Sequence, residues 1–412
     1  MHRSIECEES IVKSNIVNNS WWDMFLIKRI IQNLPSIRHL CFSICLLCSL
    51  FCCIDEYIPQ GMEEVRGILV VDGMIRNGES VFRLSYSAGT SDKLDGSQAI
   101  NHAEVYVESN DGIRVSALFS GSGVYIAQTP VLDAEKEYRF SALIDGELCE
   151  SEFLSPIITA EIDSIFPVKQ GINEPVELCV ATHDPDNSSM YYRWTYRETW
   201  EVKADLYANA RWGPSGDVIF HNLHTSENTY YCWGRDSSKT FILASAEKLS
   251  ENRITQQILT SFPCDHDKLS ILYHIETEQM QLRESAYKYF ANVNEQVERA
   301  GDIFSPILTT GLRGNIYFRG DPGRVVIGYI EVATVTSMDR YIWEREGFYK
   351  APLRRCNPDN LSDIVWWDIR TFGYSPIYLY LEKMAVRSVC VDCRVKENAS
   401  KLKPPGWLTE HL

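Results

Sequence analysis

The chain has 412 residues, of which 45% are hydrophobic and 23% charged, and its formal net charge is −16 at pH 7. This composition is typical of a folded globular protein and not of a disordered chain. The acidic balance argues against nucleic-acid binding, which needs a basic footprint, and against broad adhesion to anionic lipid.

The first predicted element is an export leader that ends at a cysteine. Basic residues at positions 28, 29 and 38 precede an apolar run over residues 40–54, and Cys53 lies at the end of that run. This layout resembles the lipobox of a bacterial lipoprotein signal peptide, with Cys53 as the acylated residue. The alternative is a transmembrane helix, but the run has about 15 residues whereas a span needs about 20.

We therefore divide the N-terminal region into a leader and a tether. Residues 1–52 form the leader, in which 24–52 is the signal peptide and the acidic stretch 1–23 reads as a misassigned start. Residues 53–66 form a tether held to lipid by acyl chains such as palmitate on Cys53. Everything after Cys53 is then expected to be exported.

The segment 67–158 predicts an N-terminal β-sandwich. Short β-branched or aromatic runs alternate with turn residues such as Asn77-Gly78 and Asn110-Asp111-Gly112. The run 138–149 has Asp145-Gly146 at its centre and predicts a hairpin with a type I′ turn. Six or seven strands over about 95 residues resemble the transthyretin-like or immunoglobulin-like modules of exported proteins.

The segment 159–412 predicts a larger β-rich domain with one inserted helix. Strand patterns recur at 177–181, 190–196 and 268–275, and again at 314–318 and 325–332. Between them, residues 283–300 carry apolar residues at three- and four-residue steps and precede Gly301, so this stretch predicts the helix. The expected fold class is therefore mainly β, a sandwich followed by a β-rich domain with one α-helix.

A set of short motifs occurs along the chain in a fixed order: the lipobox, the segment 70–73 (Val-Val-Asp-Gly), the segment 191–194 (Tyr-Tyr-Arg-Trp), Cys232-Trp233, the segment 282–289, Gly314-Asn315, Gly328-Tyr329, the segment 390–393 (Cys-Val-Asp-Cys), Lys403-Pro404 and Trp407. This ordered set resembles a family of exported Bacteroidota lipoproteins catalogued as domain of unknown function 4249. The resemblance covers most of residues 53–412. One departure is the segment 396–400, where a Gly-rich stretch would be expected.

The resemblance implies a place and a partner but no reaction. It implies a cell-surface or outer-membrane lipoprotein that works beside a TonB-dependent transporter. Asp55 and Glu56 follow the anchor and are similar to the short acidic signal that sends lipoproteins of this phylum to the outer face of the outer membrane. The alternative is a solvated tether with incidental charge.

The cysteines of the exported part predict disulfides. Seven remain after Cys53, among them the pair Cys390 and Cys393. A redox or zinc role needs a following helix or a second Cys-x-x-Cys, and neither pattern is present. A structural disulfide is expected instead, either within the pair or from one member to Cys356. We expect no metal or other cofactor, since the segments 183–187 and 264–267 read as polar turns.

Two further features are candidate sites without a reaction. The aromatic clusters that contain Trp194, Trp200 and Trp233 are a candidate binding surface, although about half of each cluster must face inward in a strand. Ser164, in Asp163-Ser164-Ile165, matches the acceptor triplet for O-glycosylation in this phylum. No Gly-x-Ser-x-Gly elbow or phosphate-binding glycine loop is present, so we expect no enzyme.

The sequence thus predicts a non-enzymatic lipoprotein that assists a TonB-dependent transporter, by capturing a nutrient or covering the transporter's mouth. A surface adhesion or structural protein is the first alternative, and an unrecognised hydrolase is the second.

Overall fold

The computed structural model describes residues 67–87, 98–221, 229–299, 313–351, 356–360, 373–379 and 382–409. These residues form a mainly β structure with one α-helix, as the sequence predicts. None of the described helices is long and apolar enough to cross a membrane.

The N-terminal part is a curled sheet of ten strands. Its strands are β1 (Leu69–Gly73), β2 (Gly78–Tyr86), β3 (Gln98–Ala99), β4 (Ala103–Ser109), β5 (Arg114–Gly121), β6 (Val124–Thr129), β7 (Tyr138–Ile144), β8 (Glu147–Ser151), β18 (Ile316–Phe318) and β19 (Val326–Ile327). The hydrogen-bonded order is β18-β8-β7-β4-β5-β6-β2-β1-β19, with β3 paired to β2. One apolar core that includes Phe82, Tyr125 and Phe140 lies inside this sheet. The expected sandwich is therefore a single, nearly closed, barrel-like sheet.

Two strands from far along the chain complete this sheet. β19 pairs in parallel with β1, and β18 pairs antiparallel with β8. The backbones approach very closely here: a Cβ on Gly328 would lie 2.2 Å from the Val71 oxygen, and Gly328 has φ +151°. A Cβ on Gly314 would likewise meet the Gly328 oxygen. Only glycine fits these two crossings. The segment 313–332, expected in the second domain, thus contributes to the first sheet.

The second part is a β-sandwich with two hydrogen-bonded sheets. The first sheet has the order β16-β10-β9, formed by β16 (Arg253–Phe262), β10 (Val176–His183) and β9 (Ile162–Val168). The second has the order β20-β17-β11-β14-β24, with β20 (Thr336–Trp343), β17 (Leu272–Leu282), β11 (Tyr191–Lys203), β14 (Tyr231–Ser237) and β24 (Ala399–Ser400), and β15 (Ile242–Ser245) pairs with β11. The two sheets enclose a core rich in large side chains, among them Leu178, Trp194 and Tyr273.

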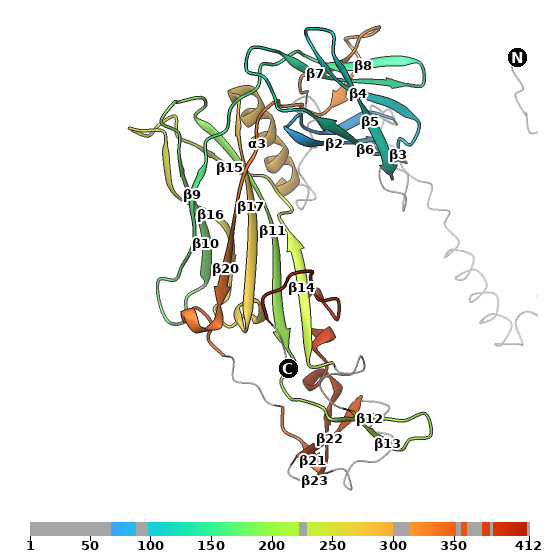
Figure 1. Cartoon of the computed structure of the whole chain (residues 1–412), viewed down its shortest axis with the longest axis vertical. Coiled ribbons are helices and arrows are strands. Elements are labelled where there is room, and N and C mark those ends of the chain that lie inside the picture. Colours follow the sequence, from blue (N-terminus) through green and yellow to red (C-terminus); the bar gives the residue numbers. More distant parts are fainter. Residues whose placement is uncertain are drawn as a thin grey trace, which may run out of the picture. The chain divides into compact units, whose positions relative to one another are not determined.

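The helix α3 (Glu284–Arg299) follows β17 directly, close to the expected range 283–300. Its buried residues Ala286, Tyr289 and Phe290 pack with Met280 of β17 and with Tyr329 in a separate apolar cluster. Figure 1 shows α3 beside the ends of β11 and β17. The helix therefore covers part of the outer face of the large sheet.

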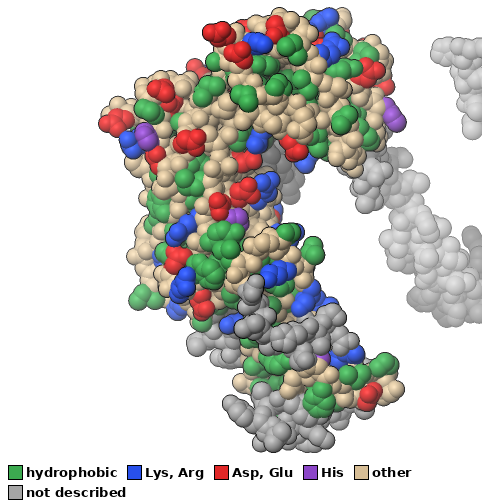
Figure 2. Space-filling view, in the orientation of Figure 1, with side chains coloured by type: hydrophobic (Ala, Val, Ile, Leu, Met, Phe, Trp, Pro, Cys, Tyr) green, Lys and Arg blue, Asp and Glu red, His purple; other side chains and the backbone are tan. Residues whose placement is uncertain are grey.

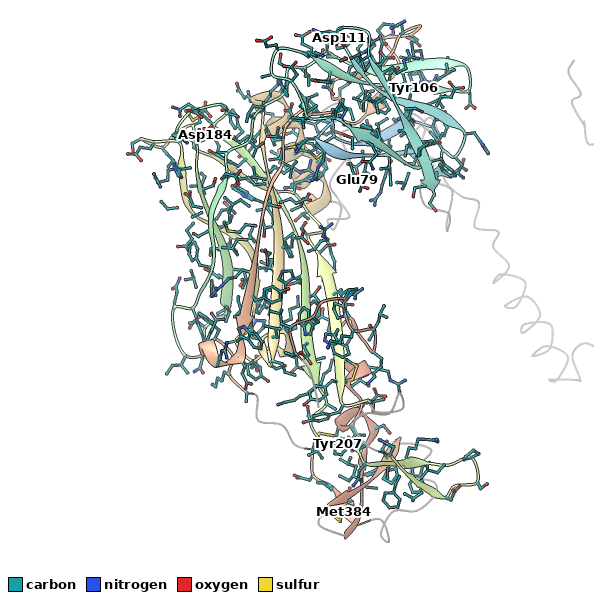
Figure 3. The ribbon with its side chains drawn as sticks, in the orientation of Figure 1. Glu79, Tyr106, Asp111, Asp184, Tyr207 and Met384 are labelled. Atoms are coloured by element: carbon teal, nitrogen blue, oxygen red, sulfur yellow. A yellow bond between two sulfur atoms is a disulfide. The ribbon has the colours of Figure 1, made fainter. Side chains whose placement is uncertain are left out.

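The remaining elements are short. They are β12 (Ala210–Trp212), β13 (Val218–Phe220), β21 (Asp359–Asn360), β22 (Tyr374–Leu379), β23 (Glu382–Arg387) and the 3-10 turns η1 (Asp267–Leu269), η3 (Glu344–Glu346), η5 (Ser388–Cys390) and η6 (Cys393–Val395). β12 pairs with β13, and β21 and β22 pair with β23. Figure 3 labels Tyr207 and Met384 in this region. A small cluster that includes Ile377, Val386 and Cys390 forms its core.

Candidate functional site

The long strand β11 presents two chemically different faces, and this alternation decides where a site can lie. Tyr192, Trp194 and Trp200 point into the sandwich core and are at most 1% exposed. The intervening residues Arg193 and Thr195 lie on the opposite face. The aromatic residues that dominate this strand in the sequence are thus mainly core residues.

The candidate aromatic binding surface is therefore wrong for the three tryptophans chosen. Trp194 and Trp200 are buried because their positions face the sheet of β9, β10 and β16, and the Trp194 Nε1 donates to Gln279 Oε1 at 2.8 Å. Trp233 of β14 is 8% exposed and packs with Leu272 and Trp407. None of these rings offers a free face for stacking a ligand.

The outer face of β11 instead lines a charged cleft where the second sheet meets the edge of the barrel. This cleft, which we call the arginine cleft, has a volume of about 210 Å³. Strands β1 and β2 and their connection supply Asp72, Gly73, Met74, Arg76, Glu79, Val81 and Arg83, while β11 and β17 supply Arg193, Thr195 and Glu278. Three arginines and three carboxylates therefore share one small space.

Arg193 is the central side chain of this cleft. Its guanidinium carbon lies 4.3 Å from the ring centroid of Phe241 and 4.6 Å from that of Phe290, so two rings hold the group. Burial lowers the pKa of Arg193 to about 10, and the charges of Asp72 and Glu278 oppose that change. Arg193 remains cationic at neutral pH. Within the described part of the chain, no side-chain hydrogen bond or ion pair joins Arg193 to another residue.

The other charges of the cleft are only partly matched. Arg76 Nη1 lies 2.9 Å from Glu278 Oε2, whereas the buried Arg76 Nε has no hydrogen-bond partner among the described residues. Glu79, labelled in Figure 3, accepts from Gln128 Nε2 at 3.2 Å. Asp72 is exposed and lies opposite Arg83 in the register of β1 and β2. The cleft thus offers a fixed guanidinium and an accessible carboxylate, which suits binding of a small polar ligand.

The family comparison includes the whole of this cleft. The family model described as Domain of unknown function (DUF4249) matches residues 54–339. The chain belongs to this family. The match spans the barrel, the arginine cleft and α3, and it ends before Cys356, Cys390 and Cys393. The segments 70–73 and 191–194, which contributed to the resemblance seen in the sequence, supply Asp72, Gly73 and Arg193, so two segments far apart in the sequence meet in one cleft.

Other comparisons add no argument about function. No curated protein matches the chain. Among solved structures, a DUF4785 family protein from Legionella pneumophila aligns at 10% identity, with a TM-score of 0.15, over 47% of this chain and 55% of that protein. The chain thus spans about half the length of that protein, and the low score supports no inference about fold.

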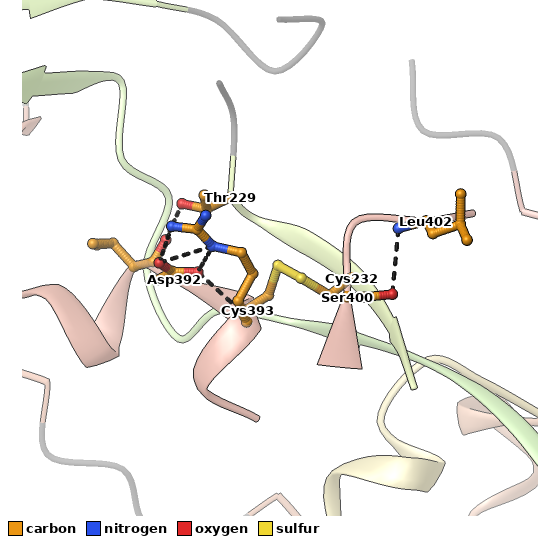
Figure 4. Close-up of a disulfide and its surroundings, with 8 residues drawn as sticks. Thr229, Cys232, Asp392, Cys393, Ser400 and Leu402 are labelled. Atoms are coloured by element: carbon orange, nitrogen blue, oxygen red, sulfur yellow. Dashed lines mark hydrogen bonds and ion pairs between the residues drawn. A yellow bond between two sulfur atoms is a disulfide. The ribbon is translucent and has the colours of Figure 1, made fainter. Parts of the chain in front are cut away.

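The cysteine pair forms two disulfides, each with a different element. Cys390 bonds to Cys356, which is one of the expected pairings, and Cys393 bonds to Cys232 of β14. Figure 4 shows the second bond and the nearby Asp392, which accepts hydrogen bonds from Arg394. Cys232 could not be chosen as a partner from local patterns, because it lies 161 residues from Cys393. An internal bond between Cys390 and Cys393 is not formed.

The remaining predicted sites lie in a strand or outside the described residues. Ser164 lies in β9, paired with Ala181 of β10, and is partly exposed. Cys53, Asp55 and Glu56 lie outside the described residues.

The two segments with metal-like composition act as turns in this structure. Asp184 is buried, and its carboxylate accepts from the backbone N–H of Asp186 at 3.0 Å, from that of Ser188 at 2.7 Å and from Gln281 Nε2 at 2.7 Å. His266 Nδ1 accepts from the N–H of Lys268 at the start of η1. The described residues contain no group of three or more side chains placed to hold a metal.

The sequence reasoning missed the arginine cleft, although one signal was available. Arg193 is a cation in the middle of an aromatic strand, and strict alternation would have placed it opposite Tyr192 and Trp194. Its partners Asp72 and Arg76 lie about 120 residues earlier, so only the tertiary fold brings them together.

Proposed function

We propose that this DUF4249 protein is a non-enzymatic, surface-exposed outer-membrane lipoprotein that captures a small ligand beside a TonB-dependent transporter. The observation that carries the proposal is the lipobox-like segment ending at Cys53, followed by Asp55 and Glu56. The acyl chains on Cys53 would attach the β structure to lipid, and the acidic pair would direct it to the outer face.

Two structural features support this proposal. The disulfides Cys232–Cys393 and Cys356–Cys390 are expected in an oxidising compartment outside the cytoplasm. The surface in Figure 2 carries interspersed acidic and basic side chains, as is common for a protein that remains in solvent around its anchor.

One cluster of the described residues has side chains of the kinds used in acid–base catalysis, but it is buried. Lys268 Nζ lies 2.5 Å from Glu198 Oε1, and the Tyr273 hydroxyl donates to Glu198 Oε2 at 2.7 Å. Exposure of these residues ranges from 0 to 7%, so a substrate cannot reach them. This cluster therefore acts in stability and not in catalysis.

Acylation is tested by metabolic labelling with a palmitate analogue. Wild-type protein is expected to incorporate the label and to fractionate with the outer membrane, whereas Cys53→Ala should lose both properties. Cys52→Ala is the matched control and should keep them. Equal labelling of wild type and Cys53→Ala would refute the anchor.

The transporter partnership is tested by affinity purification of the tagged protein from outer membranes, with mass spectrometry of what co-purifies. The proposal expects a TonB-dependent transporter in stoichiometric amount, and its absence would refute the partnership. A membrane-impermeant label on intact cells should modify the wild type and label an Asp55→Ala/Glu56→Ala variant less. Protection of the wild type would place it on the periplasmic face.

A further inference from the structure

We propose that the arginine cleft binds a small zwitterion, such as a free α-amino acid, with its carboxylate on Arg193 and its ammonium group on Asp72. This inference names the ligand class for the proposed capture function. It concerns the cleft alone and can be tested on purified protein without a transporter or a membrane.

The carboxylate is assigned to Arg193 because of how that side chain is held. The rings of Phe241 and Phe290, at 4.3 and 4.6 Å, fix the guanidinium, and no described residue takes up its donors. A guanidinium presents N–H donors in a planar fork that matches a carboxylate bidentately. Since the rings reduce the motion of the fork, less conformational freedom is lost when a ligand binds.

The ammonium group is assigned to Asp72 by the charges that remain. Glu278 is already paired with Arg76 at 2.9 Å, and Glu79 accepts from Gln128. Asp72 is the cleft carboxylate with no hydrogen bond or ion pair to another described residue. The lining as a whole carries three arginines and three carboxylates, so its charge balances and favours a ligand without net charge.

The size and walls of the cleft restrict the ligand further. A volume of about 210 Å³ lies below the roughly 300–1,000 Å³ of pockets for drug-sized molecules, so the ligand must be small. An adjoining hollow of about 30 Å³ shares Arg193 and Glu278 and has Met74, Met280 and Val335 in its walls. This hollow favours a small apolar side chain over a bulky or charged one.

The test is calorimetric titration of the full-length chain, purified in detergent, with glycine, alanine, valine, lysine, glutamate and tryptophan. Alanine or valine is expected to bind best. Propionate, which lacks the amine, and ethylamine, which lacks the carboxylate, are expected to bind at least about tenfold more weakly, since each loses one charge-assisted contact. The absence of saturable amino-acid binding by wild type up to about 10 mM would overturn the proposal.

Two variants and one matched control locate the binding. Arg193→Lys keeps the positive charge but loses the planar fork, and it should weaken alanine binding at least about tenfold. Asp72→Asn, at an exposed position, should reduce the preference for alanine over propionate. Arg197→Gln is the control, because Arg197 lies on the same strand but pairs with Glu276 at the surface.

The outcomes of these experiments test the cleft assignment and the transporter partnership separately. Weaker alanine binding in Arg193→Lys and a reduced preference for alanine over propionate in Asp72→Asn, with the control unchanged, support the assignment. Equal binding in all four proteins would place the ligand elsewhere and overturn it. Loss of co-purifying transporter in the membrane experiment, with alanine binding intact, would refute the partnership and leave the cleft assignment standing.

Discussion

Two cations near β11 lie in very different surroundings. Lys268 is enclosed in the sandwich core, where it pairs with Glu198 at 2.5 Å and lies 4.5 Å from the centroid of Trp200. Arg193 lies on the outer face between two phenyl rings and has no carboxylate contact within the described part of the chain. Both cations contact aromatic rings, but only Lys268 is fully matched.

The difference separates a structural cation from one available to a ligand. A buried charge is tolerated when a counter-charge and hydrogen bonds compensate its lost hydration. Glu198 and Tyr273 supply this compensation to Lys268. Arg193 has nearby negative charge but retains unused donors at the wall of a cleft. We therefore expect substitutions at the two positions to affect different properties.

The largest effect is expected from Lys268→Met. This change leaves the Glu198 carboxylate buried without its cation, which costs about 3–5 kcal/mol in the free energy of unfolding. Urea denaturation followed by tryptophan fluorescence measures it, because Trp194 and Trp200 lie in the same core. The double variant Lys268→Met/Glu198→Leu should regain most of the loss. A single-variant cost below about 1 kcal/mol would show that the ion pair is not needed.

Arg193→Met makes the matched change on the other face and should cost only about 1 kcal/mol, the order of its cation–π contacts. Glu278 keeps its partner Arg76, so no carboxylate loses an ion pair. The same denaturation experiment measures the effect. A cost as large as that of Lys268→Met would refute the contrast between Lys268 and Arg193, since it would mean that Arg193 also neutralises a buried charge.

The features predicted well from the sequence are local ones. The helix at 284–299 follows from apolar spacing. The hairpin between β7 and β8 follows from Asp145 and Gly146, which both have positive φ, at 51° and 83°. The mainly β class follows from many short strands with turn residues between them. Each of these depends on neighbours within a few residues.

The features that were missed depend on distant parts of the chain. The pairing of β1 with β19 joins Leu69 to Val326, and no local pattern indicates it. The arginine cleft has the same origin, because Asp72 and Arg193 meet only after the barrel-like sheet and the sandwich have formed. The tryptophans of β11 were misplaced for a different reason: alternation fixes which residues share a face, but it does not say which face is covered.

The contact between Arg193 and the ring of Phe241 can be tested by a double-mutant cycle. Phe241→Leu keeps an apolar side chain but removes the ring face below Arg193. Combined with Arg193→Met, it should give a coupling energy of about 0.5–1 kcal/mol in unfolding. The control cycle combines Phe241→Leu with Lys268→Met and should be additive, because Phe241 packs in the cluster around α3 whereas Lys268 lies against Glu198 and Trp200 in the sandwich core. Additivity in both cycles would mean that the rings do not hold Arg193.

The smallest effect on stability is expected at an exposed ion pair, because removing a counter-charge costs least there. Lys136 Nζ lies 2.7 Å from Asp111 Oδ2, and hydrogen bonds from Lys136, Ser109 and the Ile113 N–H lower the pKa of Asp111 to about 2 from 3.8. Because the folded state holds the ionised form, this stabilisation is present above about pH 4 and is lost as the pH falls toward 2.

Asp111→Asn should therefore be slightly less stable than wild type at pH 7, and the two should converge between about pH 4 and 2. The effect should also shrink in high salt, since water and ions screen an exposed pair. Thermal unfolding at pH 7, 4 and 2.5 measures the difference, with Lys136→Met as the control that removes the first partner. A difference that stays constant with pH would show that the carboxylate's charge is not responsible. If Asp111→Asn destabilised the protein as much as Lys268→Met does, burial would not explain why the Lys268–Glu198 pair contributes more to stability than an exposed pair.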